Sequence, residues 1–265
     1  MFRGFELKMG KAGFIADYDP QSNFKTEGNC LKAAYQKDFG NRLQTVTEAS
    51  TGIIDGNEIE DAWFPQFPGH FHVFLSHSHA DENLAVAIAG LLKRKLDLDV
   101  FVDSLVWDFK DELIRKFYRL GDQTWSRLVS ICSHVDCMLM KSLIEMMDSC
   151  ECLLFLNTPK SVTVENAVKQ TYSPWIYAEL EASRFLRLHQ DETRKPLLLK
   201  ENFGDRSKQA SAEFKVAYRI PNHLTKLSTN GFSNWMTRSR DRKGFDALDI
   251  LYELAPDSPR PVRES

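Results

Sequence analysis

The chain has 265 residues, of which 43% are hydrophobic, so it can bury the core of one large domain or of one domain with extensions. Its 34 basic and 37 acidic residues give a net charge of −3, which favours neither nucleic acid nor an anionic membrane as a partner. The five cysteines form no CxxC pair, which indicates reduced thiols. Because we find neither a long apolar run nor a signal-peptide segment, we expect a cytoplasmic location.

The chain order suggests a central domain with two flanking segments. Residues 1–69 have no clean periodicity and end in PQFPG, so we expect an N-terminal extension before a domain at 70–230. Residues 231–265 contain an amphipathic stretch and a charged, Pro-rich tail, which predict a C-terminal helix and tail. The basic residues of RSRDRKG lie beside Asp241 and Asp246, a pattern more typical of a solvated face than of a phosphate site.

Short apolar runs alternate with helical patterns in the central domain. The predicted strands are HVFLS (72–76), DVFVDS (99–104), CLLFLN (152–157), KPLLLK (195–200) and a weaker VAYRI (216–220). The predicted helices include 84–96, 111–120 and 138–147, and the last two make the second crossover unusually long. Strands that are apolar on both faces and alternate with helices indicate an α/β, doubly wound fold with a mostly parallel five-stranded sheet.

The stretch SPWIYAELEASRF (173–185) begins with a strong helix signal, because Ser173 can cap the first turn and Pro174 suits the first helical position. Helical periodicity places Glu179 within the apolar stripe that also includes Phe185. A buried carboxylate must find partners, change its protonation or line a cleft. The alternative is that Glu179 lies at the margin of the stripe and reaches water or a nearby base.

Ligands of open parallel sheets bind beyond the carboxyl ends of the strands, so three loops are candidates for a site: 76–83, 103–111 and 157–175. A receiver-like phosphoacceptor site at Asp103 would need an acidic pair after the first strand, where only Asp81 is present. Phosphate-binding GxGxxG and GxxxxGK[ST] loops and a GxSxG elbow are absent from the sequence.

Metal binding is the main alternative chemistry. Strand geometry separates His72 from His77 by roughly 16 Å, which leaves only His77 and His79 able to share a loop site. Cys132, His134 and Cys137 would point in different directions from a helix. We therefore expect no metal site and no bound cofactor.

Several of these segments together resemble the Toll/interleukin-1 receptor (TIR) domain over residues 71–220. The resemblance rests on HVFLSHSHADE, DVFVD, CECLLFLNTP and above all SPWIYAELE, where a Glu follows the Trp by four residues. It implies a flavodoxin-like fold and, by similarity to free-standing bacterial members, cleavage of NAD⁺ at the nicotinamide–ribose bond in antiviral defence. The product would be linear or cyclic ADP-ribose, acting through NAD⁺ depletion or as a signal to an effector protein.

The resemblance also implies roles for individual residues. The catalytic carboxylate would be Glu179, and Trp175 would form a wall of the cleft. The remaining substrate contacts would come from the first two loops: Ser76, His77, Ser78, His79, Asp103, Trp107 and, as an alternative aromatic contact, Phe109. The long region 103–135 suggests self-association, which completes the site in many TIR enzymes. The competing interpretations are a non-catalytic TIR scaffold and a nucleotide-binding sensor.

Overall fold

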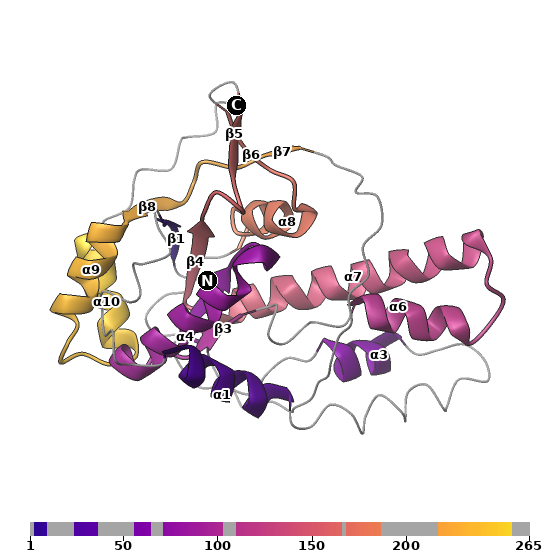
Figure 1. The fold of residues 1–265 in the computed structure, drawn as a ribbon, viewed down its shortest axis with the longest axis horizontal. Helices are drawn as coiled ribbons and strands as arrows, with labels where there is room; N and C mark the ends of the chain where they lie inside the picture. The colour runs from indigo at the N-terminus through magenta and orange to yellow at the C-terminus, as the bar shows by residue number, and fades with distance from the viewer. Residues whose placement is uncertain are drawn as a thin grey trace.

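A computed structural model describes residues 3–9, 24–36, 56–64, 71–102, 110–165, 168–186 and 217–255. Its main sheet has five strands in the order β3-β2-β4-β1-β8, and every pairing is parallel (Figure 1). The strands are β1 (Arg3–Lys8), β2 (Val73–Ser76), β3 (Val100–Phe101), β4 (Cys152–Asn157) and β8 (Thr225–Ser228). This confirms the predicted α/β, doubly wound class with a mostly parallel five-stranded sheet.

Helices occupy the connections between these strands. The helices of the described ranges are α1 (Phe24–Gln36), α3 (Gly56–Trp63), α4 (Glu82–Leu96), α6 (Lys110–Arg119), α7 (Trp125–Ser149), α8 (Pro174–Ala182), α9 (Thr229–Arg238) and α10 (Phe245–Leu254). The predicted pair between the second and third strands is therefore present as α6 and the 25-residue α7. No helix in the part of the chain that the structure describes combines the length and apolar composition needed to cross a bilayer.

The N-terminal segment differs from the predicted extension, because β1 lies inside the main sheet, between β4 and β8. Successive side chains of β1 face opposite sides of the sheet, as strand geometry requires. Phe5 and Leu7 are fully buried, and the Phe5 ring stacks on Tyr252 of α10 with 6.0 Å between ring centroids. Glu6 points to the other side. Because the polar Glu6 interrupts so short an apolar run, periodicity analysis does not identify this strand.

The last two predicted strands also differ from expectation. Residues 195–200 lie outside the described residues. Of 216–220, Tyr218–Arg219 forms β7, which pairs in a separate antiparallel sheet with β6 (Val168–Thr171), itself paired with β5 (Thr163–Glu165). The side chains of β7 are only half-buried or exposed, whereas a central parallel strand is covered on both faces. β8 occupies the edge of the main sheet instead.

Two glycines set the packing of α1 on α4. A Cβ on Gly90 would lie 2.2 Å from the carbonyl oxygen of Phe24, and one on Gly28 would lie 2.3 Å from that of Val86. The two helices can therefore approach each other only where both positions lack a side chain. Helix α4 also contacts the start of α10, because Gly244, the residue before α10, donates its N–H to the Leu96 carbonyl at 2.8 Å.

Candidate functional site

The order of the strands places a switch point between β2 and β4. After β2, the next strand along the chain, β3, lies on the side of β2 away from β4. After β4, the next strand of the main sheet, β8, lies in the opposite direction, beyond β1. Crevices at such points, beyond the carboxyl ends of the strands, are the usual ligand sites of open parallel sheets. The loops that follow β2 and β4 are therefore the first place to look for a site.

A buried polar network joins these two loops. Asp81, at the end of a 3₁₀ turn (His79–Asp81) after β2, is 6% exposed and accepts a hydrogen bond from the Thr158 hydroxyl at 2.5 Å. Thr158 Oγ1 in turn accepts from the backbone N–H groups of Lys160 and Ser161 at 3.1 and 3.2 Å. The Lys160 amino group lies 3.6 Å from the Asp81 carboxylate and donates to the Ala80 carbonyl at 2.9 Å. The network fixes the two loops relative to each other.

Three neighbouring strands carry a row of side chains on one face of the sheet. The register pairs Ser76 of β2 with Phe155 of β4, and Phe155 with Glu6 of β1, so all three point the same way. Ser76 is fully buried, and its hydroxyl makes no hydrogen bond within the described residues. Glu6 is 7% exposed and accepts hydrogen bonds from Asn157 and from Lys169 of β6. The face that carries this row is thus the one toward β6.

Helix α8 follows β6 and packs against β6, β7 and α7. The Ser173 hydroxyl accepts a hydrogen bond from Ile176 N–H at 3.2 Å and Pro174 opens the helix, which confirms the predicted start. Glu179 is 2% exposed, so the alternative in which its carboxylate reaches water at the stripe margin is wrong. Glu181 lies on the opposite face, where it pairs with Arg184 at 2.7 Å.

The end of α8 differs from expectation. The helix stops at Ala182, and Phe185, which the periodicity placed on the buried stripe, is 67% exposed. The Ser183 hydroxyl lies 2.7 Å from His223 Nε2, a contact between the end of α8 and the segment before β8. The predicted stripe assumes a turn of 100° per residue as far as Phe185. Because the helix ends three residues earlier, Phe185 points away from the core.

The start of α6 meets α8 at Trp175. The Lys110 amino group lies 4.6 Å from the centre of the Trp175 ring and 2.5 Å from Asp136 of α7. Burial and the neighbouring Asp136 raise the pKa of Cys132, one turn away on α7, above its ordinary value. Trp175 is half-buried and packs against the core, so it both anchors α8 and presents part of its ring to the end of the second loop.

The predicted site residues therefore fall into three groups. Ser76, His77 and Glu179 are buried, and Trp175 is half-buried. Ser78 caps the 3₁₀ turn by accepting from Ala80 N–H at 3.3 Å, and His79 is exposed. Asp103, Trp107 and Phe109 lie outside the described residues. Within the described ranges, no three His, Cys, Asp or Glu side chains gather closely enough to hold a metal ion.

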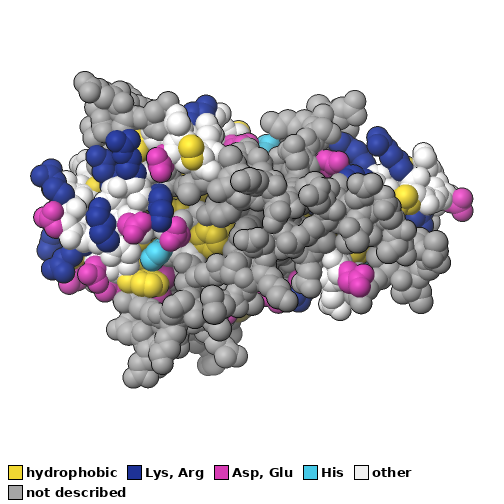
Figure 2. Space-filling view, turned by 90° about the horizontal axis from the view of Figure 1, so that it is seen from below, with side chains coloured by type: hydrophobic (Ala, Val, Ile, Leu, Met, Phe, Trp, Pro, Cys, Tyr) yellow, Lys and Arg dark blue, Asp and Glu magenta, His cyan; other side chains and the backbone are white. Residues whose placement is uncertain are grey.

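Several polar residues of this region were not singled out by the sequence analysis: Glu6, Asn157, Thr158, Lys160, Ser161 and Lys169. Their partners are far away in the chain, and Asp81 and Thr158 are separated by 77 positions. The TP dipeptide that follows the apolar run CLLFLN is the local signal that marks the loop after β4 as a polar strand exit. The charged residues at 238–243 are exposed. Figure 2 shows one face of the molecule on which Lys and Arg side chains are interspersed with Asp and Glu.

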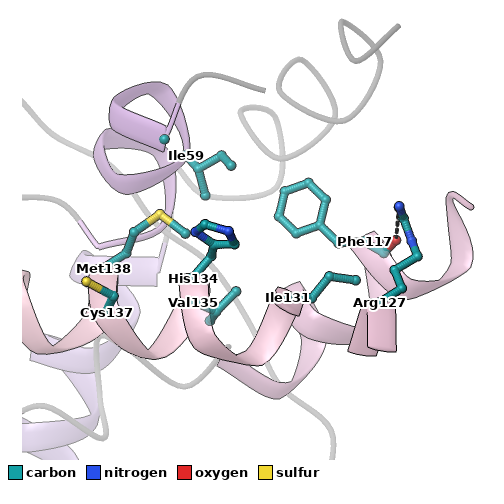
Figure 3. A pocket seen from close by; sticks show the side chains of 9 residues that line it. Ile59, Phe117, Arg127, Ile131, His134, Val135, Cys137 and Met138 are labelled. Carbon is teal, nitrogen blue, oxygen red and sulfur yellow. Dashed lines mark hydrogen bonds between the residues drawn. The ribbon is translucent and has the colours of Figure 1, made fainter. Parts of the chain in front are cut away.

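A cavity lies elsewhere, between α3, α6 and α7 (Figure 3). His134 and Cys137 line it, whereas Cys132, which the sequence groups with them, does not. Comparison of the chain with protein-family models, with curated proteins and with solved structures finds no match.

Proposed function

We propose that the protein is a cytoplasmic TIR-type enzyme that cleaves the nicotinamide–ribose bond of NAD⁺, with Glu179 as its catalytic carboxylate. The observation that carries the proposal is the burial of Glu179, at 2% exposure, on a helix that packs against β6, β7 and α7. A carboxylate excluded from water keeps its electrostatic effect at short range. Substrate entry must open α8 or its neighbours enough to bring the ribose to this side chain.

The chemistry needs one fixed negative charge. As the glycosidic bond breaks, positive charge develops at the anomeric carbon of the ribose, and nicotinamide leaves as a neutral group. Glu179 would stabilise that charge and hold the ribose hydroxyls. Water attack on the anomeric carbon gives linear ADP-ribose, and attack by the adenine ring of the same molecule gives a cyclic product. NAD⁺ is the substrate in this scheme, and no additional cofactor takes part.

Cationic side chains at the same edge support a dinucleotide ligand. The side chains of Lys160 and Lys169 are 60% and 38% exposed, although each also contacts an acidic residue, Asp81 and Glu6 respectively. Both follow β4, at the switch point where phosphates of nucleotides bind in related architectures. By the resemblance to TIR domains, His77, Ser78 and His79 would line the nicotinamide-ribose side, Trp175 would form a wall of the cleft, and Asp103 and Trp107 would supply further contacts.

The direct test is nicotinamide release from NAD⁺, measured by chromatography and mass spectrometry. We expect release by the wild type and a loss of at least about a hundredfold in Glu179→Gln, on the scale of removing one transition-state charge contact. Glu181→Gln is the matched control, because Glu181 lies on the same helix but pairs with Arg184 on the outer face. Full activity in Glu179→Gln, or no release by the wild type at high protein concentration, would overturn the proposal.

A second candidate function is a non-catalytic TIR scaffold that acts by self-association. It is favoured by large apolar side chains exposed around the α6–α7 turn, namely Leu120 at 55%, Trp125 at 77% and Val129 at 46%. Light scattering of the wild type and Trp125→Ser separates the two candidates. A scaffold predicts assembly that depends on Trp125 and no change in NAD⁺. An enzyme that works as an oligomer predicts assembly together with nicotinamide release, and its product would reach any effector protein by diffusion.

A further inference from the structure

A cavity of about 420 Å³ lies between α3, α6 and α7, away from the residues of the proposed active site (Figure 3). Its volume is within the range of about 300–1,000 Å³ that is typical of small-molecule sites. The walls are largely apolar: Ile59, Phe117, Ile131, Val135 and Met138. Glu60, the acidic residue next to Ile59, is engaged elsewhere, since it accepts hydrogen bonds from Lys141 and Ser142.

The cavity is elongated along α7. Arg127, Ile131, Val135 and Met138 follow each other at spacings of four, four and three residues, so they form one stripe on the helix. Eleven residues at about 1.5 Å per residue make this stripe roughly 16 Å long. Figure 3 shows Arg127 at one end, beyond Phe117 and Ile131, and Met138 at the other. An apolar groove of this length fits a linear chain better than a compact ring system.

The charge at the Arg127 end is positive and is not neutralised by an acidic side chain within the described residues. One terminal nitrogen of Arg127 donates to the Phe117 carbonyl at 3.1 Å, and its Nε–H is buried without an acceptor. Burying a charged donor without a full set of acceptors is costly, and a carboxylate is the partner that matches a guanidinium in charge and shape. His134 and Cys137, both exposed, line the cavity nearer the Met138 end.

We propose that this cavity binds a straight-chain monocarboxylate, with the alkyl chain against the apolar stripe of α7 and the carboxylate at Arg127. The site is separate from Glu179 and does not depend on the proposed NAD⁺ cleavage, because binding can be measured without turnover. Helix α7 nevertheless touches both regions, since Asp136 on its other side pairs with the lysine that covers Trp175. We therefore expect a ligand bound in the cavity to affect the surroundings of Trp175 on α8 as well.

The probe is decanoate, titrated into the full chain by isothermal calorimetry below the concentration at which it forms micelles, with decanol as its neutral counterpart. We expect the wild type to bind decanoate about tenfold more tightly than decanol, because a charge-assisted pair to Arg127 is worth at least that factor. Equal affinities for the two probes, or no saturable binding of decanoate, would overturn the proposal without any variant being made.

Three variants locate the site. Ile131→Trp fills the middle of the cavity and should weaken decanoate binding at least about tenfold, whereas Ile144→Trp adds the same ring to an exposed position of the same helix and should leave binding unchanged. Arg127→Gln should remove the preference for decanoate over decanol while decanol still binds. Thermal unfolding of each variant is recorded first, because Arg127 also caps the end of α6 through Phe117. Unchanged binding in a folded Ile131→Trp protein would show that decanoate binds elsewhere.

Discussion

The amino group of Lys110 lies 4.6 Å from the centre of the Trp175 ring, which places the first residue of α6 on the first turn of α8. A cation at this distance is attracted by the face of an indole, and the contact is worth about 0.5–1 kcal/mol where water still reaches the pair. This contact links Lys110, at the end of the loop 103–111, to α8, the helix that carries Glu179.

We predict a measurable coupling between these two residues. In a double-mutant cycle of Lys110→Met and Trp175→Leu, urea unfolding should give a coupling free energy of about 0.5–1 kcal/mol. The exposed pair Arg184 and Phe185, with 5.9 Å between the guanidinium and the ring centre, is the comparison and should couple more weakly. Coupling of zero for Lys110 and Trp175 would mean that the ammonium is held by Asp136 alone.

The hydroxyl of Thr158 should contribute more to stability than the nearby surface charge. Thr158→Val removes the donor to the buried Asp81 carboxylate and is expected to lower the free energy of unfolding by about 1–3 kcal/mol. Lys160→Ala removes a charge whose side chain is 60% exposed and should cost about 0–1 kcal/mol. Chemical denaturation of both variants checks the order, and a larger loss for Lys160→Ala would contradict the assigned role of the network.

A side chain at Gly90 should disrupt the packing of α1 on α4. Gly90→Ala places a methyl group 2.2 Å from the Phe24 carbonyl oxygen, so the helices must separate, at a cost of about 1–3 kcal/mol. Gly56→Ala is the matched control, because a Cβ there meets no atom within 4 Å and alanine favours a helix. Thermal unfolding should show a lower midpoint for Gly90→Ala only. Equal midpoints would mean that α1 does not pack tightly on α4 in solution.

The buried thiol of Cys150 should make stability fall at alkaline pH. Burial raises the pKa of Cys150 from its ordinary 9.0 to about 12, so the folded state holds this proton more tightly than the unfolded state. The resulting stabilisation is complete below pH 9 and is lost as pH rises from 9 toward 12. Relative to Cys150→Ala, the wild type should lose about 1.4 kcal/mol per pH unit above that point.

Urea unfolding across the alkaline range measures this difference. Cys30→Ala serves as the control, since it removes a thiol that is exposed. Burial also raises the pKa of Cys152, so Cys152→Ala should behave like Cys150→Ala. A difference between wild type and Cys150→Ala that does not depend on pH would show that the thiol reaches water.

Local signals were enough to predict some elements and not others. The helix at 84–96 and the strands at 72–76 and 152–157 follow from periodicity and apolar runs, and the cap at Ser173 defines the start of α8. Local signals do not predict the pairing of β1, because Glu6 interrupts its apolar residues and its partner β4 lies about 150 positions later in the chain. β8 was hidden for a related reason: Leu227 is the buried residue of this edge strand.

The same distinction applies to the candidate site. Helical periodicity places Glu179 within the apolar stripe but leaves a position at the stripe margin as an alternative, and the structure shows that the side chain is buried. The hydrogen bond from Thr158 to Asp81 could not be predicted, because it depends on how closely two loops approach after the sheet has formed. The cavity beside α7 could not be predicted from the sequence either, because its walls come from three helices. The apolar stripe on α7 alone has the same pattern as a surface that faces the core.

The position of β1 between β4 and β8 has a consequence for how the protein is made. Residues 3–8 are synthesised before their hydrogen-bonding partners, residues 152–157 and 225–228, so the sheet cannot be completed until those later segments have been translated. Until then β1 has no partner strand, and its backbone N–H and C=O groups are open to pairing with other chains. A chaperone that shields β1 while the rest of the chain is made should therefore raise the folding yield.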